Sequence, residues 1–383
     1  MPEIRYIRNV GALRNLDGEV RMQLQQVTRK YPFRANNYYL SLIDWTDPSD
    51  PIRHIVVPQQ GELEQFGVLD ASEEKTNYVA PGCQHKYPHT VLLLCTEMCG
   101  AFCRFCFRKR LFMEKTGETA IDLTPGLEYI RRTPQVTNVL LTGGDPLFLS
   151  TARLSEIISR VREIPHVKII RLGSKMPAFN PYRIIRDPEL LELLARYSSP
   201  SGRIYVMTHF NVPRELTAPA MKALDLLMKA GVTLANQSPI LRGINDNPEV
   251  LAELMRRLSF AGVPPYYFFQ CRPTEGNRPF QLPLVQAYRL LEKAKSKVSG
   301  LAKRARLVMS HASGKIEIVG VTREHIHVKY HRARDPQDEG RLVALTRDDS
   351  AAWLDDLLPA KRPGVRFRQF SSDDPNRFSP ECG

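Results

Sequence analysis

Long apolar runs are absent from this chain of 383 residues, and no stretch approaches the roughly 20 apolar residues that a membrane-spanning helix needs. The first residues, MPEIRYIRNVGALRNL, contain neither the apolar segment of a secretion signal nor a small-residue cleavage site. We therefore expect a soluble, cytoplasmic protein with no membrane partner. Hydrophobic residues still make up 43% of the chain, which is enough for a large core and argues against wholesale disorder.

Acidic residues are also scarce relative to basic ones, 41 against 54, and the formal net charge is +13. Such an excess can serve nucleic acid, but it equally serves small molecules that carry phosphate or carboxylate. The basic residues are spread along the chain with small clusters at 108–110 and 303–306, and we find no RGG tract, zinc finger or extended basic arm. The charge pattern therefore does not favour a nucleic-acid partner.

Cysteine is infrequent, yet three of the seven cysteines, Cys99, Cys103 and Cys106, fall within one short segment. An odd number of cysteines without an export signal fits thiolate ligation better than a disulfide framework. Three thiolates in one loop can hold three irons of a cubane cluster and leave the fourth iron open. Zinc is the alternative, and a tetrahedral site would need a fourth ligand, which His85 or His89 could offer.

Short apolar segments of buried-strand type alternate with helical segments through the middle of the chain. The predicted strands are 90–95, 138–142, 167–172, 203–208, 232–238 and 266–270, and the predicted helices are 151–164, 188–197, 218–230, 248–261 and 284–297. This alternation predicts repeated βα units around a parallel sheet. About six units are fewer than a closed eightfold barrel contains, so we expect an α/β fold with an incomplete (βα)6 barrel.

The flanking regions have a different texture. A helix is predicted over 17–31, and strands are predicted at 315–319, 325–330 and 341–346. We expect four parts, which are an N-terminal helical and irregular extension, the partial barrel, a C-terminal strand-rich region with a cofactor lysine, and a flexible tail. Their boundaries are 1–84, 85–300, 301–362 and 363–383.

The cysteine loop has the spacing C-x3-C-x2-C after a first strand and resembles the radical S-adenosylmethionine (SAM) superfamily, with Phe105 as the usual aromatic before the third cysteine. Gly143, Gly144 and Asp145 follow the next strand and look like the superfamily's loop for the SAM amino group. A Gly-rich segment can be only a tight turn, but its position one βα unit after the cysteines favours the functional interpretation. The resemblance implies a [4Fe–4S] cluster, SAM, and an external electron donor of flavodoxin or ferredoxin type.

Several further stretches look specifically like lysine 2,3-aminomutase and its relatives. They lie at 85–88, 208–211, 236–238, 241–246 and 265–271, in the same order and with similar spacing, and the similarity spans about residues 35–330. The resemblance implies a third cofactor, pyridoxal 5′-phosphate (PLP), and a small-molecule amino-acid substrate. In that reaction a SAM-derived radical takes the C3 hydrogen of the substrate and the α-amino group migrates to C3.

The resemblance assigns roles to individual positions. Lys315 matches the catalytic lysine that carries PLP, and Lys86 and Tyr87 match residues that hold the PLP phosphate. His209 and Gln237 match residues near SAM. A solvated lysine at the start of a strand is the alternative interpretation of Lys315.

Arg108 matches the arginine that binds the substrate carboxylate. A guanidinium can hold a carboxylate through two parallel hydrogen bonds, and this one would stand beside the cluster. The alternative is a surface position within the basic run.

The chain departs from the lysine-specific pattern at the distal end of the substrate. Lysine-specific members place an acidic residue directly after the Gln–Cys pair and another before the Gly-rich loop, whereas Arg272 follows Cys271 here and 307–310 contains no acid. A cation at this position would repel the ammonium of lysine and attract a carboxylate or phosphate. We therefore expect an acidic, glutamate-like substrate, with an outward-facing Arg272 as the alternative.

Two smaller departures concern PLP. Thr90 stands where the family tends to have a basic residue near the phosphate, and 311–314 replaces an all-glycine run before Lys315. Three other hypotheses stay open: a PLP-independent radical SAM enzyme, a lysine 2,3-aminomutase acting on free or protein-bound lysine, and a cluster-bearing redox sensor on nucleic acid. Relatives form dimers or larger assemblies, so a homo-oligomer is one expected state.

Overall fold

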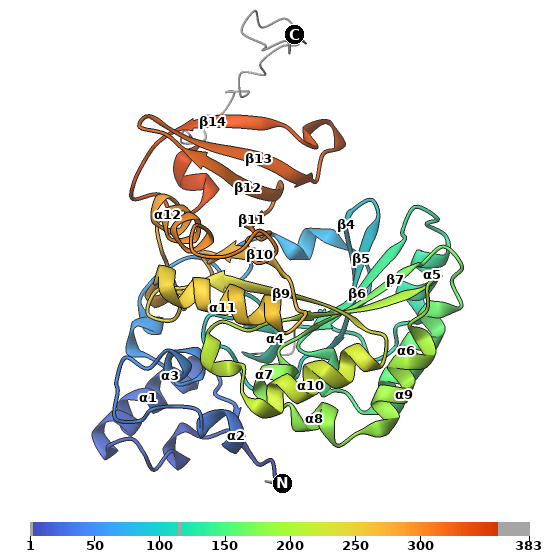
Figure 1. The fold of residues 1–383 in the computed structure, drawn as a ribbon, viewed down its shortest axis with the longest axis horizontal. Helices are drawn as coiled ribbons and strands as arrows, with labels where there is room; N and C mark the ends of the chain where they lie inside the picture. Colours follow the sequence, from blue (N-terminus) through green and yellow to red (C-terminus); the bar gives the residue numbers. More distant parts are fainter. Residues whose placement is uncertain (1–2, 114–115, 359–383) are drawn as a thin grey trace, which may run out of the picture.

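The computed structural model describes residues 3–113 and 116–358, which form a 12-stranded mixed sheet, a two-stranded sheet and surrounding helices (Figure 1). The order of strands in the large sheet is β14-β13-β12-β11-β10-β9-β8-β7-β6-β5-β4-β3. The strands are β1 (Tyr6–Ile7), β2 (Ala35–Asn36), β3 (Tyr78–Ala80), β4 (Cys83–Tyr87), β5 (Thr90–Thr96), β6 (Asn138–Gly143), β7 (Ile169–Ser174), β8 (Arg203–Thr208), β9 (Thr233–Ile240), β10 (Pro265–Gln270), β11 (Arg306–His311), β12 (Gly314–Val321), β13 (His325–Ala333) and β14 (Leu342–Thr346).

Neighbouring strands within the set β5 to β11 are parallel, and antiparallel hairpins extend the sheet at both ends. The six predicted strands of the middle region are β5 to β10, with ends that differ by at most two residues. Strand β11 was not predicted, because the charges of 303–306 adjoin its short apolar centre. The α/β class with a parallel sheet is therefore confirmed.

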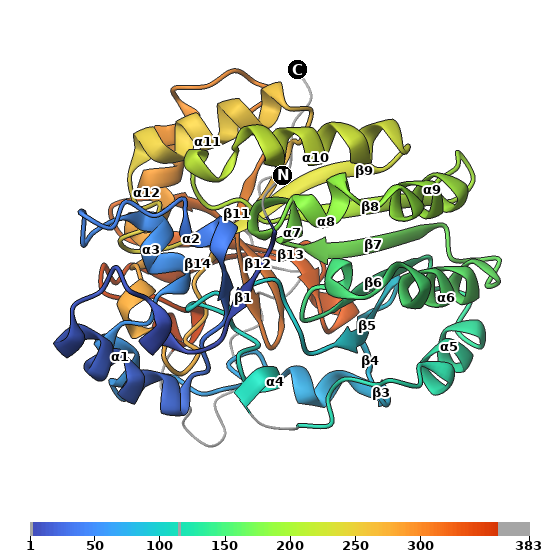
Figure 2. The same cartoon turned by 90° about the horizontal axis from the view of Figure 1, so that it is seen from below.

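Helices line the outer side of the parallel strands (Figures 1 and 2). The helices are α1 (Gly18–Lys30), α2 (Asn37–Leu40), α3 (Pro51–Val56), α4 (Arg110–Met113), α5 (Thr124–Arg131), α6 (Thr151–Arg162), α7 (Met176–Phe179), α8 (Tyr182–Ile185), α9 (Pro188–Tyr197), α10 (Ala218–Lys229), α11 (Pro248–Phe260) and α12 (Leu284–Lys295). Of the helices predicted in the middle of the chain, four begin at a residue whose side-chain oxygen caps them, at Ser150, Asp187, Thr217 and Asn247. These caps explain why the predicted helix starts are confirmed.

Alternation along each strand separates the packed side of the sheet from its inner side. In β7, Ile170 and Leu172 are fully buried in the cluster that includes Leu154 and Ile158 of α6. Arg171 lies between them and therefore faces the other side. There its Nε donates to Asn138 Oδ1 at 2.8 Å. The inner side of the sheet is thus polar enough to bind ligands.

The N-terminal region covers the edge of the sheet at which the carboxyl ends of the parallel strands lie (Figure 2). A second hydrophobic cluster joins its residues, including Ile55 and Phe33, to Phe105, Cys271 and Phe280 from segments that follow strands. Loops at the carboxyl ends of parallel strands are where α/β proteins bind ligands. The N-terminal region therefore encloses the expected site.

The two ends of the large sheet approach each other through side chains. We call these contacts the seam: Lys86 Nζ to His311 O, Ser72 Oγ to Ser310 O, Arg334 Nη1 to Thr76 Oγ1, and the Arg332 guanidinium over the Tyr87 ring. Within the described residues no backbone ladder joins β3 to β14. The seam brings β4 and its preceding segment against β11 to β13.

Two expectations concern regions at or beyond the limits of the structure. The predicted tail, 363–383, lies outside the described residues, and the sheet continues without interruption across the boundary predicted at 300 and 301. In the described part of the chain no helix is both long enough and apolar enough to cross a membrane.

Candidate active site

The cysteine loop follows β5 and is held by the N-terminal region. Arg34 Nε donates to Cys99 O at 2.9 Å, and Phe102 N donates to Arg34 O at 2.8 Å. Burial and nearby negative groups, including Cys103 and Cys106, raise the pKa of the Cys99 thiol well above its ordinary value. The three thiols therefore lie close enough to influence one another and would need added positive charge to stay ionised together.

The donor chemistry of this loop fits a cluster better than a single ion. Among the described residues, no three of His, Cys, Asp and Glu are gathered at the spacing of one metal ion. The ligands of a cubane cluster need not converge on one metal ion, because each thiolate binds a different iron. His85 and His89, the zinc alternative's extra ligands, contact Tyr129 OH and Gln135 O instead.

A buried ion pair holds the cysteine loop in place. Arg104 donates to Glu62 through Nε and Nη2 at 2.7–3.1 Å, and the two side chains are 2% and 0% exposed. Its remaining donors reach the carbonyls of Tyr31 and Pro32. Arg104 thus ties the loop to the chain segment after α1.

Breaking this pair should destabilise the protein. We expect Glu62→Gln to lower the free energy of unfolding by about 3 kcal/mol, because it leaves a buried guanidinium without its counter-charge. Urea denaturation of the purified protein measures the change. Glu128→Gln is the matched control, since Glu128 is 53% exposed and pairs with Arg132 at 3.9 Å, and its loss should cost about 0.5 kcal/mol or less. Equal effects of the two variants would contradict the prediction.

The Gly-Gly-Asp loop packs against the start of the cysteine loop. Gly143 has φ 105°, and a Cβ there would lie 2.4 Å from Thr96 O; a Cβ on Gly144 would lie 2.4 Å from Met98 O. Gly144 N also donates to Thr96 O at 2.6 Å. Both glycines are therefore required for the close approach of two backbone segments.

Asp145 is occupied by protein donors. Its carboxylate accepts hydrogen bonds from Leu147 N, Ser174 Oγ, Lys175 N and Met176 N at 2.8–3.1 Å. Burial raises its pKa to about 6 despite these bonds. The side chain thus ties the loop after β6 to the loop after β7, a role that the sequence did not indicate.

A polar group near the cysteine loop lacks a protein partner. His209 lies 5.9 Å from Phe105 between ring centroids, and its buried Nε2 has no hydrogen-bond partner among the described residues. Burial, together with Lys175, holds the pKa of His209 well below its ordinary value, so its ring is neutral. Gln237 is partly exposed in β9. An unsatisfied group such as His209 Nε2 fits a polar ligand such as SAM.

Lys315 lies inside the molecule at the start of β12. Its Nζ is 4.3 Å from the centroid of the Tyr267 ring and 5.4 Å from that of Phe269. Burial, followed by the positive charges of Arg171 and three other basic side chains, lowers the pKa of Lys315 to about 7. This environment disfavours the alternative of a solvated surface lysine, and the low pKa leaves part of the amine neutral near pH 7.

This low pKa predicts how PLP loading depends on pH. Only the neutral amine of Lys315 attacks an aldehyde, and the neutral fraction falls as the pH drops below the pKa. We expect the loading rate to fall about tenfold per pH unit below pH 7 and to level off above it. Stopped-flow absorbance after adding PLP to the cofactor-free protein measures the rate. A rate that keeps rising to about pH 10 would show an ordinary lysine instead.

Lys86 and Tyr87 of β4 lie across the seam and reach the space around Lys315. Lys86 donates to His311 O, and burial lowers its pKa to about 8. Burial raises the pKa of Tyr87 to about 12, and Arg332 stacks 5.2 Å from its ring centroid. Lys315 and Arg332 are direct cross-strand partners, so the fold unites these basic side chains around one space.

Sequence reasoning missed Arg171 and Arg332. Arg171 carried a signal, because a charged residue inside an apolar strand is unusual. Arg332 carried none, because its partners come from β4 and β12. Thr90, which stands where the family tends to have a basic residue, is buried and pairs with Tyr87 in the β4–β5 hairpin.

Arg108 and Arg272 meet at an acid that the sequence did not single out, Glu74. Arg108 Nε and Nη2 donate to its carboxylate at 2.9 and 3.0 Å, and Arg108 Nη1 donates to Thr142 Oγ1 at 2.9 Å. Arg272 stacks 3.7 Å from the Phe107 ring centroid and donates from Nη1 to Glu74 at 3.4 Å. The alternatives that placed Arg108 and Arg272 on the surface are therefore wrong.

Comparison with known proteins identifies the family. No family model matches the chain. A putative L-lysine 2,3-aminomutase of Aquifex aeolicus (strain VF5) is 52% identical over 355 residues, which cover 92% of this chain and 95% of that protein. The chain belongs to the lysine 2,3-aminomutase family.

Other relatives of this aminomutase family member differ in name and length. L-lysine 2,3-aminomutase of Clostridium subterminale is 41% identical over 69% of this chain, which spans only 62% of that enzyme. Glutamate 2,3-aminomutase of Clostridioides difficile (strain 630) is 34% identical over 73% of this chain and 65% of its own length. A solved radical SAM methyltransferase from Sphaerobacter thermophilus is similar over 59% of this chain and 68% of its own, at 17% identity and a TM-score of 0.39.

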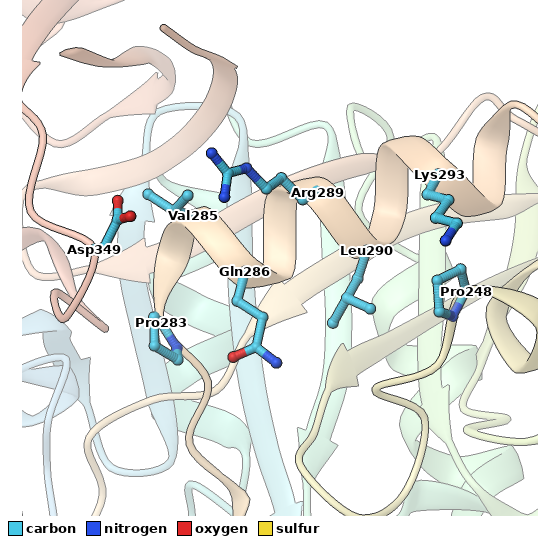
Figure 3. A pocket seen from close by; sticks show the side chains of 8 residues that line it. All are labelled: Pro248, Pro283, Val285, Gln286, Arg289, Leu290, Lys293 and Asp349. Atoms are coloured by element: carbon cyan, nitrogen blue, oxygen red, sulfur yellow. The ribbon is translucent and has the colours of Figure 1, made fainter. Parts of the chain in front are cut away.

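This aminomutase family member is a radical SAM isomerase, and the family's cofactors are a [4Fe–4S] cluster, SAM and PLP. A cavity of about 440 Å³ lies elsewhere, on the outer side of α12 (Figure 3). Gln286, Arg289, Leu290 and Lys293 line it, and no predicted site residue does. This cavity lies outside the sheet, apart from the residues that match the family's cofactor-binding positions.

Proposed function

We propose that this chain is a PLP-dependent 2,3-aminomutase of an acidic, glutamate-like amino acid. The observation that carries the substrate class is Arg272, a guanidinium with a side chain only 16% exposed that donates one weak hydrogen bond among the described residues. Such a buried and underused cation favours an anionic ligand. The basic side chains around Lys315 add to this positive surface.

Each cofactor has a set of residues suited to it. Cys99, Cys103 and Cys106 would hold the cluster, as thiolates on three irons. SAM would lie near the unpartnered Nε2 of His209 and near Gln237. Gly143, Gly144 and Asp145 would shape that region, with the glycines allowing close approach and Asp145 holding two loops together.

PLP would occupy the space around Lys315. Lys315 would hold it, and Lys86, Tyr87, Arg171 and Arg332 would bind its phosphate. Arg332 supplies the cation that Thr90 does not. When bound, PLP supplies the delocalised π-system that makes amino migration between adjacent carbons feasible.

The chain's own residues orient and protect the substrate. Arg108 binds the α-carboxylate, and Arg272 binds the distal carboxylate. The reaction is an isomerisation in which the amino group moves from C2 to C3 and one hydrogen moves from C3 to C2, so the substrate undergoes no net redox change. An external flavodoxin- or ferredoxin-type donor supplies the electron that starts it.

We also propose that β5 to β10 form an incomplete (βα)6 barrel whose open side is covered by the seam. The seam and the N-terminal region would exclude water from the reacting centre. Exclusion of water protects reactive species from side reactions.

Turnover under matched conditions tests the substrate class. The anaerobically reconstituted protein receives SAM, PLP and a reductant, and is offered L-glutamate, L-2-aminoadipate or L-lysine. We expect faster formation of the β-amino isomer from an acidic amino acid than from lysine. Faster turnover of lysine than of every acidic amino acid would overturn the proposal.

Lysine is the second candidate substrate. The Aquifex aeolicus relative is named as a putative L-lysine 2,3-aminomutase, and Glu74 places one acid beside Arg272. Against it, the three arginines around Glu74 already bind its carboxylate. The same turnover comparison decides between the two candidates.

A further inference from the structure

Glu74 occupies the centre of a compact charge cluster formed with Arg108, Arg110 and Arg272. Burial would raise the pKa of its carboxyl, but the charges of Arg108, Arg272 and Arg110 hold that pKa well below the ordinary value. The side chain is 10% exposed. Glu74 is therefore a permanent buried anion whose position is set by three arginines from two other segments of the chain.

The three arginines are not equivalent. Arg110 is the most fully bonded of the three: Glu118 accepts from its Nε and Nη2 at 2.8 Å, Glu74 accepts from Nη2 at 3.0 Å, Phe107 O accepts from Nη1, and Asp70 lies 3.8 Å from Nη1. Arg108 uses Nε and Nη2 for Glu74 and one Nη1 hydrogen for Thr142. One hydrogen each on Nη1 and Nη2 of Arg108 is left for a further acceptor.

Arg272 is the least satisfied of the three. Among the described residues it donates only from Nη1 to Glu74 Oε1, at 3.4 Å. Its guanidinium lies on the face of Phe107, and Arg108 lies 5.0 Å from the same ring centroid. Arg108 and Arg272 thus share one carboxylate and one aromatic ring and keep free donors.

This sharing fixes the distance between the two arginines. Arg108 Nη2 and Arg272 Nη1 both bond the same oxygen, Glu74 Oε1, at 3.0 and 3.4 Å. The two nitrogens cannot be farther apart than these two distances together. The shared carboxylate therefore holds the two guanidinium groups close together, which favours a substrate whose two carboxylates lie only a few bonds apart.

Resting on the proposed function, we propose that Glu74 is a positioning residue that holds Arg108 and Arg272 at the separation of a dicarboxylic amino acid of glutamate length, and so sets substrate length. Aspartate is too short for a productive reaction, because C2 and C3 both carry a carboxylate and moving the amino group gives aspartate again. Glutamate is the shortest member of the series that yields a different product, with the amino group on the central carbon.

Variants at Glu74 test this role in the reconstituted holoenzyme. The readouts are KM and kcat for L-glutamate, inhibition constants for L-aspartate and L-2-aminoadipate, and thermal unfolding as a check of folding. We expect Glu74→Gln and Glu74→Asp to raise KM for glutamate by about tenfold or more, with a smaller effect on kcat. We also expect the discrimination between glutamate and 2-aminoadipate to shrink in both.

Glu118→Gln is the matched control, because Glu118 is a buried carboxylate that bonds Arg110 and contacts neither Arg108 nor Arg272 in the described structure. It should leave length discrimination unchanged. Glu74→Asp keeps the charge and alters only the reach, so wild-type discrimination in this variant would overturn the positioning role. Tighter glutamate binding by Glu74→Gln would also overturn it, since Glu74 would then be competing with the substrate.

The outcomes also separate this inference from the proposed function. If the wild-type enzyme turns over lysine faster than any acidic amino acid, the substrate class is wrong and the inference is wrong with it. If the wild type prefers glutamate and Glu74→Asp keeps that preference, the substrate class stands and only the role of Glu74 is wrong.

Discussion

Replacing Lys315 with alanine should abolish aminomutase activity, with a fall of at least about 10³-fold in kcat. The neutral amine beside Tyr267 and Phe269 is the covalent attachment point that we propose for PLP. Its removal leaves the cysteine loop untouched, so reductive cleavage of SAM should persist without product. Loss of one activity and retention of the other distinguishes a missing PLP site from a misfolded protein.

Borohydride reduction after adding PLP, followed by peptide mass mapping, locates the attachment directly. In the wild-type protein we expect a pyridoxyl group on Lys315, and in Lys315→Ala none. Lys329→Ala is a matched control, because Lys329 lies in the neighbouring strand β13 and is exposed. No adduct in the wild type, with the cluster intact and SAM still cleaved, would instead indicate a PLP-independent radical SAM enzyme.

Replacing Cys103 with alanine should remove the cluster and every activity that depends on it. Two remaining thiolates cannot hold three irons of a cubane. We expect iron and sulfide contents near zero after anaerobic reconstitution, no visible absorbance of the cluster, and no SAM cleavage. The wild-type cluster should bleach in air, because its fourth iron has no thiolate.

Cys95→Ala provides the control for this prediction. Cys95 is buried at the end of β5, only four residues before the loop, and its Sγ donates to Thr142 O at 3.5 Å. We expect this variant to retain its iron, since Cys95 is not one of the proposed ligands. Full iron content in Cys103→Ala, or equal loss in both variants, would refute the assignment of the three ligands.

Local signals explain why much of the fold was predictable. Helix α9 was predicted at its observed ends, because Asp187 caps it and Pro188 suits its first position. Strand β8 was also predicted at its observed ends, because its apolar run is isolated by polar loops. The cysteine loop was accessible for the same reason, since its three thiols are close in sequence as well as in space.

The rest of the site depends on contacts that sequence spacing does not encode. Glu74 contacts Arg272 across 198 residues, and nothing around it distinguishes it from the exposed acids of the N-terminal region. Arg332 reaches Tyr87 only after the hairpin of β12 and β13 folds against β4. The family resemblance supplied Lys315 and Arg108 without revealing that Arg108 and Arg272 share one acid.

The seam gives this protein a definite order of assembly during synthesis. Its hydrogen bonds join residues that are 225, 238 and 258 positions apart in sequence, so it cannot form until the C-terminal hairpins have left the ribosome. At the usual rate of translation, on the order of 5–20 residues per second, the cysteine loop emerges many seconds before Lys315 does. During that interval the inner side of the nascent sheet has no C-terminal cover. The last hairpins then close the seam over it.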